Sequence, residues 1–275
     1  MANRLKPNQS ISTHKMIKQE FVEFANYLAD ISENVATKYF RHEFFETSKE
    51  DQSPVTLADK ETEEVIRNAI KNKFPDHGII GEEFAAINEG AKYQWVIDPI
   101  DGTISFVIGR PIFGNLIALC EDGEPILGVI NQPIAKERWV GIKDGDAFFN
   151  GKKIQTRKCQ NLSDAVLCST SPFFFQGKDL EMLNKISSQT KYQSQGGIIY
   201  GGDCYLFGLL AMGQIDVIIE QGLNSFDFAA LATVVESAGG IITDWKGNSL
   251  NINSDGKILA CGDKNLHKEL LKMLN

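Results

Sequence analysis

The sequence predicts a fold of the α/β class in which layers of helices and layers of sheet are stacked. Two helical stretches open the chain, short strand-like segments follow, and helices and strands then alternate to the C-terminus. Because every helix or sheet has to bury its apolar face against another element, this order is typical of stacked layers.

The first half is expected to contain two helices and a sheet. Residues 16–40 are predicted as an amphipathic helix because apolar residues recur there at helical spacing. A second helix is expected to follow Thr56 as its N-cap, with Asp59 three residues later, and to end at the turn of residues 75–78. Strands of an antiparallel sheet are expected at residues 79–80, 95–97, 114–120, 126–131 and 138–142.

The second half is expected to alternate between strands and helices. Strands are predicted at residues 165–169, 198–200, 215–220 and 240–243. Helices are predicted at residues 179–187, 203–212, 226–237 and 265–274. No linker separates the halves, so we expect a single domain over residues 1–275, with one lobe at about 1–150 and the other at about 151–275.

Composition excludes several classes of protein. With 28 Lys and Arg against 36 Asp and Glu, the net charge is −8, whereas a general nucleic-acid binder needs a basic surface. The apolar stretch at residues 112–120 is far shorter than the roughly 20 residues of a membrane span. The N-terminal residues 1–18 carry no apolar signal, and the 5 cysteines are widely spaced. We therefore expect a cytoplasmic protein that binds neither membrane nor nucleic acid.

The strongest chemical signal is the segment Asp98-Pro99-Ile100-Asp101-Gly102-Thr103, which follows an apolar strand. It delivers two carboxylates on a turn that proline stiffens and glycine permits. Carboxylate oxygens are the ligands that Mg²⁺ prefers. The glycine and threonine are expected to begin a short helix whose free N–H groups bind a phosphate.

Three further acidic positions are ambiguous when each is taken alone. Glu82 and Glu83 end a strand, where a solvated charge pair is common. Asp227 lies in the first turn of an apolar helix, where a carboxylate also stabilises the helix dipole. Asp59 lies where a capping acid is expected.

Taken together and in this order, the segments resemble the motifs of the inositol monophosphatase superfamily of Mg²⁺-dependent phosphatases. They are Val-Thr-x-x-Asp at 55–59, Gly-Glu-Glu at 81–83, Asp-Pro-Ile-Asp-Gly-Thr at 98–103 and Asp-x-Ala-Ala at 227–230. One such fragment is a weak signal, whereas four of them in this order, spread over nearly the whole chain, are highly specific. The resemblance implies an α/β/α/β/α architecture and a homodimer.

The resemblance also implies a role for each site residue. The implied metal ligands, for about two or three Mg²⁺ ions, are Glu82, Asp98, the backbone carbonyl of Ile100, Asp101 and Asp227. The implied catalytic residues, which orient and deprotonate the attacking water, are Asp59, Glu82 and Thr103, with Glu83 nearby. The implied substrate contacts are Asp101, Gly102, Thr103, Gly201, Gly202, Asp203, Glu220 and Asp227. The attack is then direct, without a phosphoenzyme.

Within the superfamily, the segments at 53–56, 105–114 and 200–205 resemble the histidinol-phosphatase branch. L-Histidinol phosphate carries an amino group and an imidazole, which Asp203 and Glu220 would bind. An equally supported interpretation makes Asp203 the N-cap of its helix. Two positions depart from the branch pattern, because Asn115 replaces a threonine and Phe226 replaces a tryptophan.

The expected function is therefore that of a Mg²⁺-dependent phosphomonoesterase acting on L-histidinol phosphate. Inositol 1-phosphate and 3′-phosphoadenosine 5′-phosphate are alternative substrates. A role of another class is that of a non-catalytic partner in an RNA-processing or transcription assembly. The complete set of acidic ligands favours an enzyme. The same acids account for much of the negative net charge, which bound Mg²⁺ would offset.

Overall fold

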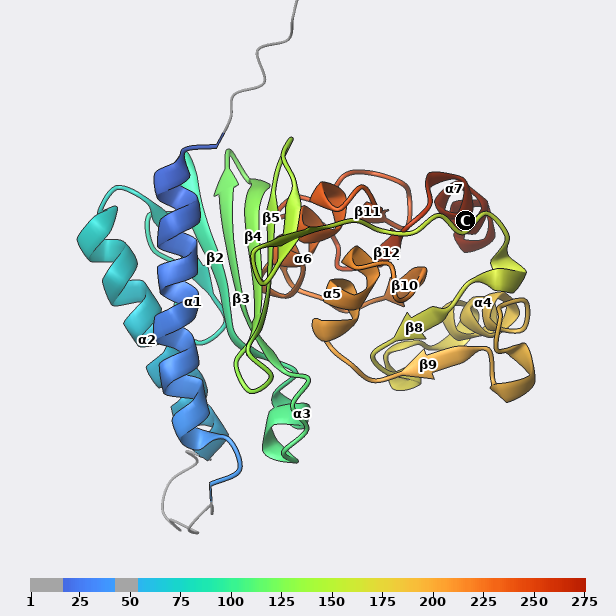
Figure 1. Cartoon of the computed structure of the whole chain (residues 1–275), viewed down its shortest axis with the longest axis horizontal. Coiled ribbons are helices and arrows are strands. Elements are labelled where there is room, and N and C mark those ends of the chain that lie inside the picture. Colours follow the sequence, from blue (N-terminus) through green and yellow to red (C-terminus); the bar gives the residue numbers. More distant parts are fainter. Residues whose placement is uncertain (1–16, 43–53) are drawn as a thin grey trace, which may run out of the picture.

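The computed structural model describes residues 17–42 and 54–275, which form five stacked layers (Figure 1). The outer layer consists of helices α1 (Gln19–Tyr39) and α2 (Pro54–Lys73). Behind them lie a seven-stranded sheet, helices α5 (Tyr205–Ala211) and α6 (Ser225–Ser237), a five-stranded sheet, and finally helices α4 (Gly177–Ser187) and α7 (Lys264–Leu274). The expected α/β/α/β/α architecture is confirmed.

The first sheet has its strands in chain order. They are β1 (Gly78–Gly81), β2 (Tyr93–Asp101), β3 (Gly114–Glu121), β4 (Glu124–Gln132), β5 (Glu137–Ile142), β6 (Ala147–Phe149) and β7 (Lys152–Ile154). The sheet is mixed, so the prediction of a purely antiparallel sheet is wrong at one edge, where β1 runs parallel to β2. Strands β6 and β7 were not expected, because residues 143–153 are rich in Asp, Gly, Asn and Lys, a composition that indicates turns.

Helix α6 packs directly on the first sheet, and its apolar residues are buried there and against α5. A Cβ atom on Gly128 of β4 would lie 2.2 Å from the carbonyl oxygen of Ala230, and one on Gly141 of β5 would lie 2.5 Å from the Cα atom of Val234. Glycine is therefore required at both positions for the helix backbone to approach the strands. This close contact sets the position of the N-terminus of α6, where Asp227 lies.

The second sheet has the strand order β11-β12-β10-β8-β9. Its strands are β8 (Leu167–Ser169), β9 (Ile198–Tyr200), β10 (Val217–Glu220), β11 (Ile241–Asp244) and β12 (Ile258–Cys261). Strand β12 was not expected, although it is fully buried and pairs with both β10 and β11. Only four residues long, it carries no alternation, since both of its faces are covered.

Helix α2 begins at Pro54, where the fixed φ of proline suits a first turn. Thr56 therefore lies inside the helix, and its prediction as the N-cap is wrong. Asp59 is beyond the first turn and is 4% exposed, so it is a buried acid rather than a capping one. The predicted features of residues 1–16 and of Ser53 lie outside the described residues.

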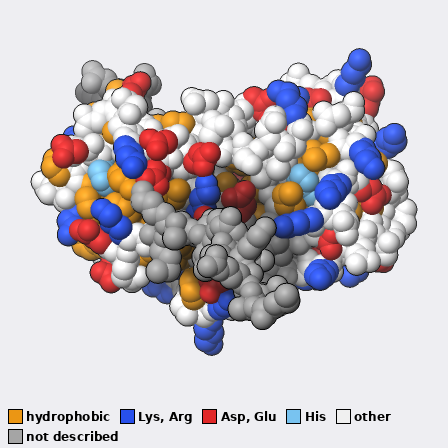
Figure 2. Space-filling model, turned by 90° about the horizontal axis from the view of Figure 1, so that it is seen from above, with side chains coloured by type: hydrophobic (Ala, Val, Ile, Leu, Met, Phe, Trp, Pro, Cys, Tyr) orange, Lys and Arg blue, Asp and Glu red, His pale blue; other side chains and the backbone are white. Residues whose placement is uncertain are grey.

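Charged side chains of both signs are mixed on one face of the molecule. Figure 2 shows Lys and Arg side chains interspersed with Asp and Glu on the face that it presents. Among the described residues, no helix is both long and apolar enough to cross a bilayer. All five cysteines are buried free thiols.

Candidate active site

The Asp98–Asp101 turn is a bulge at the end of β2. Asp98 pairs with Leu116 of β3 and Asp101 with Gly114, so that the two residues between the acids leave the ladder. The Asp98 Oδ1 atom accepts the Ile100 N–H at 3.0 Å, and the Thr103 hydroxyl donates to the Ile100 carbonyl at 3.3 Å. Both acids are thereby directed to the same side of the turn, and Thr103 begins the short helix α3 (Thr103–Val107), as predicted.

Asp227 meets this turn from the N-terminus of α6. Its Oδ2 atom accepts the Asn224 N–H at 2.5 Å within a capping box, which orients the carboxylate. Carboxylate oxygens of Asp98, Asp101 and Asp227 all lie within 4.8 Å of one another. The carboxyl group of Glu82 lies close enough to that of Asp98 for each to affect the pKa of the other, so Glu82 is the fourth acid of the group. The structure therefore brings together the four carboxylates that were predicted as metal ligands.

The loop that carries Glu82 is held by two residues that sequence reasoning missed. The Glu63 carboxylate accepts the backbone N–H of Glu83 at 2.8 Å. Arg67 donates to Glu63 at 2.6 Å and to the carbonyl of Phe84 at 2.7 Å. The sequence does carry a signal for this pair: two opposite charges lie four residues apart on the buried face of α2. Buried ions need partners, so such a pair points to contacts with a neighbouring segment.

Asp59 lies beside this loop with a free acceptor. Its Oδ1 atom has no hydrogen-bond partner among the described residues. Burial, followed by the charges of Glu83 and Glu82, raises the pKa of Asp59 to about 8. An orphaned buried carboxylate oxygen is costly unless a ligand or water binds to it.

The electrostatics of the four converging acids fit a cation. Burial, and then the charges of Asp101 and Glu82, raise the pKa of Asp98 well above its ordinary value. Burial, and then the charges of Asp203 and Asp227, raise the pKa of Asp101 to about 7. Oxygen donors that repel one another in a buried site are the donor set that Mg²⁺ binds, since it takes oxygen ligands and would remove the repulsion.

A cavity of about 690 Å³ opens from Asp101 and Asp227 toward the second sheet. Asp203, Glu220, Arg110, Gly201 and three phenylalanines are among the residues that line it. Glu220 is 1% exposed, and its carboxylate accepts the Thr170 N–H at 2.6 Å and is within 3.4 Å of the Ser169 hydroxyl. Burial raises the pKa of Glu220 to about 8 although these donors oppose the rise.

Asp203 is a wall of this cavity and not a helix cap, so the N-cap interpretation is wrong. The N-cap of α5 is Cys204, and Asp203 precedes it with a φ of 45°. The Asp203 Oδ2 atom instead accepts the Ser105 hydroxyl at 2.7 Å, from an element 98 residues earlier. Gly202 does not line the cavity with its neighbours, because it is buried against Leu206.

Comparisons with known proteins agree with this geometry. The model of the inositol monophosphatase family matches residues 17–275. The bifunctional phosphatase IMPL2 of Arabidopsis thaliana chloroplasts is 43% identical over 263 residues, which is 92% of this chain and 75% of that protein. The histidinol-phosphatase of Chlorobaculum parvum is 34% identical and covers 87% of this chain and 91% of its own length.

The structure is also similar to that of an inositol monophosphatase from Zymomonas mobilis. The two share 43% sequence identity and a TM-score of 0.86, over 93% of this chain and 98% of the other. The relatives therefore include proteins named as histidinol-phosphatase and as inositol monophosphatase, which correspond to two of the three substrates that the sequence left open.

Proposed function

The chain belongs to the inositol monophosphatase family, and from this membership we propose that it is a cytoplasmic, Mg²⁺-dependent phosphomonoesterase that hydrolyses L-histidinol phosphate. The observation that carries the proposal is the cavity between the two sheets. It joins the group of acids around Asp101 to a wall formed by Asp203 and Glu220.

The acids of the turn and of α6 are suited to hold the cation. Asp98, Asp101 and Asp227 would share it, with Glu82 and the carbonyl of Ile100 as further ligands. When bound, about two or three Mg²⁺ ions would neutralise a phosphate dianion and acidify water. The described residues support this assignment, since none of the ion pairs among them involves one of the four carboxylates.

The remaining residues of the turn would position the phosphate and the attacking water. Gly102 and Thr103 line the cavity at the start of α3, and their backbone N–H groups would donate to phosphate oxygens. The Thr103 hydroxyl would orient the water. The free Oδ1 atom of Asp59, with Glu82 beside it, would accept its proton. Attack on phosphorus is then direct and in line.

The cavity wall favours a substrate that carries a cation. Among the described residues, four acids line the cavity, Asp101, Asp203, Glu220 and Asp227, together with one base, Arg110. After two acids are assigned to the metal, Asp203 and Glu220 remain for the substrate. An ammonium or imidazolium beside Glu220 would favour its ionised form, whereas a neutral polyol offers only hydrogen bonds. Phe173 and Phe174 supply apolar faces for an imidazole ring.

A panel of phosphate esters tests this proposal. Phosphate release is measured at saturating Mg²⁺ from L-histidinol phosphate, inositol 1-phosphate and 3′-phosphoadenosine 5′-phosphate. We expect kcat/KM for histidinol phosphate to exceed the others by at least about 10-fold, which is the effect of about 1.4 kcal/mol. Faster cleavage of inositol 1-phosphate would overturn the assignment of histidinol phosphate as the substrate. If no ester is cleaved, the proposal of an enzyme is overturned in favour of a non-catalytic partner.

Two variants separate selection of the substrate from catalysis. Asp203→Asn and Glu220→Gln keep the side-chain volume and remove the charge. We expect each to raise KM for histidinol phosphate by about 10-fold or more, because a charge-assisted hydrogen bond becomes a neutral one. β-Glycerophosphate, which carries no cation, is the control substrate. Equal losses on both substrates would show that the two acids only support the structure.

We further propose a homodimer that covers the apolar rim of the cavity. Three of the ten large apolar side chains that are exposed among the described residues line the cavity: Ile104, Phe173 and Phe174. Four more lie in the segments next to cavity residues: Val107 and Ile108 follow Ile104, and Ile199 and Tyr200 precede Gly201. An apolar surface of this kind is typical of an interface between proteins. Light scattering after gel filtration should give a dimer mass, and Ile104→Asp with Phe173→Asp should give a monomer. Tyr27→Asp, on α1, is the control, and a monomeric wild-type protein overturns the proposal.

A further inference from the structure

Three polar residues form a row across the first sheet, toward the Asp98–Asp101 turn. Asn115 of β3 pairs with Asn131 of β4, and Asn131 pairs with Arg138 of β5. Directly paired residues of neighbouring strands point to the same face, so the three side chains lie in contact. The two asparagines are 0% and 1% exposed, so their amide groups depend on partners within the protein.

The hydrogen bonds along the row run in one direction. Arg138 Nε donates to Asn131 Oδ1 at 2.8 Å, Asn131 Nδ2 donates to Asn115 Oδ1 at 3.2 Å, and Asn115 Nδ2 donates to the Pro99 carbonyl at 2.6 Å. A guanidinium group only donates and a backbone carbonyl only accepts. The two ends therefore permit a single orientation of each amide between them.

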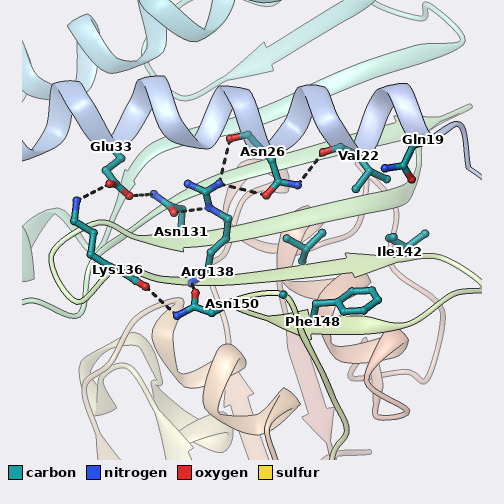
Figure 3. Close-up of a pocket in the computed structure, with 12 residues that line it drawn as sticks. Gln19, Val22, Asn26, Glu33, Asn131, Lys136, Arg138, Ile142, Phe148 and Asn150 are labelled. Carbon is teal, nitrogen blue, oxygen red and sulfur yellow. Dashed lines mark hydrogen bonds and ion pairs between the residues drawn. The ribbon is translucent and has the colours of Figure 1, made fainter.

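The outer end of the row is anchored on α1, where it borders a cavity of about 590 Å³ (Figure 3). Arg138 donates to the carbonyl of Asn26 at 3.2 Å and to the carboxylate of Asp30 at 2.7 Å. Glu33 accepts from Lys136 at 2.5 Å and lies 3.5 Å from Asn131 Nδ2. The guanidinium group is thereby held in place before it meets the first amide.

The inner end of the row supplies a donor that the bulge requires. Pro99 and Ile100 leave the β2–β3 ladder between Asp98 and Asp101, so the Pro99 carbonyl has no partner in that ladder. It is buried, and the Asn115 amide donates to it. Because Pro99 lies between two acids of the site, the Asn115 amide that binds its carbonyl is placed to fix the backbone between those acids.

We propose that Arg138, Asn131 and Asn115 form a relay that fixes the turn between Asp98 and Asp101, so that Asn115 and Asn131 are positioning residues for the cation and for the reaction. This inference rests on the proposed function only in taking the four acids as the cation site. Residues that hold metal ligands in place typically contribute about 10–100-fold to affinity or activity.

The test measures cation affinity without substrate. Asn115→Leu and Asn131→Leu keep the volume and remove the amide, and Mn²⁺ binding is followed by calorimetry. We expect the Kd for Mn²⁺ to rise by about 10–100-fold in each. The Kd for Mn²⁺ of the double variant should be little higher than that of either single variant, because both substitutions interrupt the same chain of hydrogen bonds. kcat should fall in the same order.

The control is Gln132→Leu, on the same strand. Gln132 is also buried, and its amide oxygen accepts the Ala135 N–H at 2.6 Å, outside the relay. This variant should lower the Tm in EDTA as much as the others while leaving the Mn²⁺ affinity within about two-fold of wild type, a change of less than about 0.5 kcal/mol.

Should a leucine variant fail to fold, Asn131→Asp keeps the side-chain shape and the acceptor for Arg138 but cannot donate to Asn115. It should weaken Mn²⁺ binding as the leucine variants do. The relay is overturned if these variants lower the Tm and leave the Mn²⁺ affinity unchanged. Weakened Mn²⁺ binding in a chain that hydrolyses no ester would support the relay and overturn the proposed function, so the two failures are distinguishable.

Discussion

The carboxylate of Asp101 accepts a hydrogen bond from the backbone N–H of Cys204, 2.7 Å away and 103 residues later in the chain. This bond connects the turn at the end of β2 with the N-terminus of α5. Since Asp203 immediately precedes that helix, the acid proposed to bind the cation and the acid proposed to bind the substrate are held in one arrangement. Asp101 therefore has two roles: its charge is proposed to bind the cation, and its oxygen accepts the hydrogen bond that joins the turn to α5.

Asp101→Asn separates these two roles. The amide keeps an oxygen that accepts the Cys204 N–H, whereas the negative charge is lost. We expect kcat to fall by more than about 100-fold. The Tm in EDTA should stay or rise, because the variant removes a buried charge and its repulsion by Asp203 and Asp227, which together raise the pKa of Asp101. Steady-state kinetics and calorimetry check this. Turnover within about 10-fold of wild type would contradict the role of Asp101 at the cation.

Stability without divalent cations should fall as the pH rises. Burial raises the pKa of Asp59 and of Glu220 to about 8, and that of Asp101 to about 7. The folded protein keeps these protons over a pH range in which the unfolded chain has lost them, so their stabilising effect is complete at low pH and is lost as the pH rises through about 7–8.

The measurement is the Tm in EDTA between pH 6.5 and pH 9. This window lies above the range in which His267 contributes, since burial lowers the pKa of His267 to about 4. We expect the Tm to fall by at least about 2–4 °C, the shift that 1 kcal/mol produces in a domain of similar size. Mg²⁺ should reduce the fall because cations bind the ionised carboxylates. A Tm in EDTA that rises with pH would contradict the burial of these acids.

Arg67→Met should destabilise the protein strongly. Its partner Glu63 has a fully buried side chain and would lose its counter-ion. Removing one member of a buried ion pair typically costs about 3–5 kcal/mol. The control is Lys38→Met in the exposed Lys38–Glu61 pair, where at most about 1 kcal/mol is expected. Denaturation by urea measures both, and equal effects would show that the Glu63–Arg67 pair does not hold the Glu82 loop.

Gly102→Ala should damage the site beyond its effect on the backbone. Gly102 has a φ of 81°, and a Cβ atom there would lie 2.6 Å from the Asp203 carboxylate. Gly90→Ala is the matched control, because Gly90 has a φ of 79° and no atom within 4 Å of its Cβ position. Both should lose about 1–2 kcal/mol of stability from the left-handed conformation. Only Gly102→Ala should raise KM for histidinol phosphate, and an unchanged KM would exclude Asp203 from the substrate site.

The local patterns predicted the layers and most elements, and the failures have physical causes. Strands β6 and β7 lie in a segment rich in residues that favour turns, and β12 is buried on both faces, so none of the three shows the alternation of a half-buried strand. The parallel pairing of β1 depends on the path of the loop that carries Glu82, which no periodicity describes. The N-cap interpretation of Asp203 failed because a cap and a cavity wall need the same residue type before a helix.

By itself, the sequence determined the α/β class and the acidic residues of the site, because an apolar strand that ends in Asp-Pro-Ile-Asp-Gly-Thr is a local pattern. Only the tertiary structure decided which groups hold those acids. Ser105 with Asp203, Cys204 with Asp101, and Asn131 with Asn115 are 98, 103 and 16 residues apart. Such pairs meet only after the sheets and helices have packed, so composition and spacing carry no record of them.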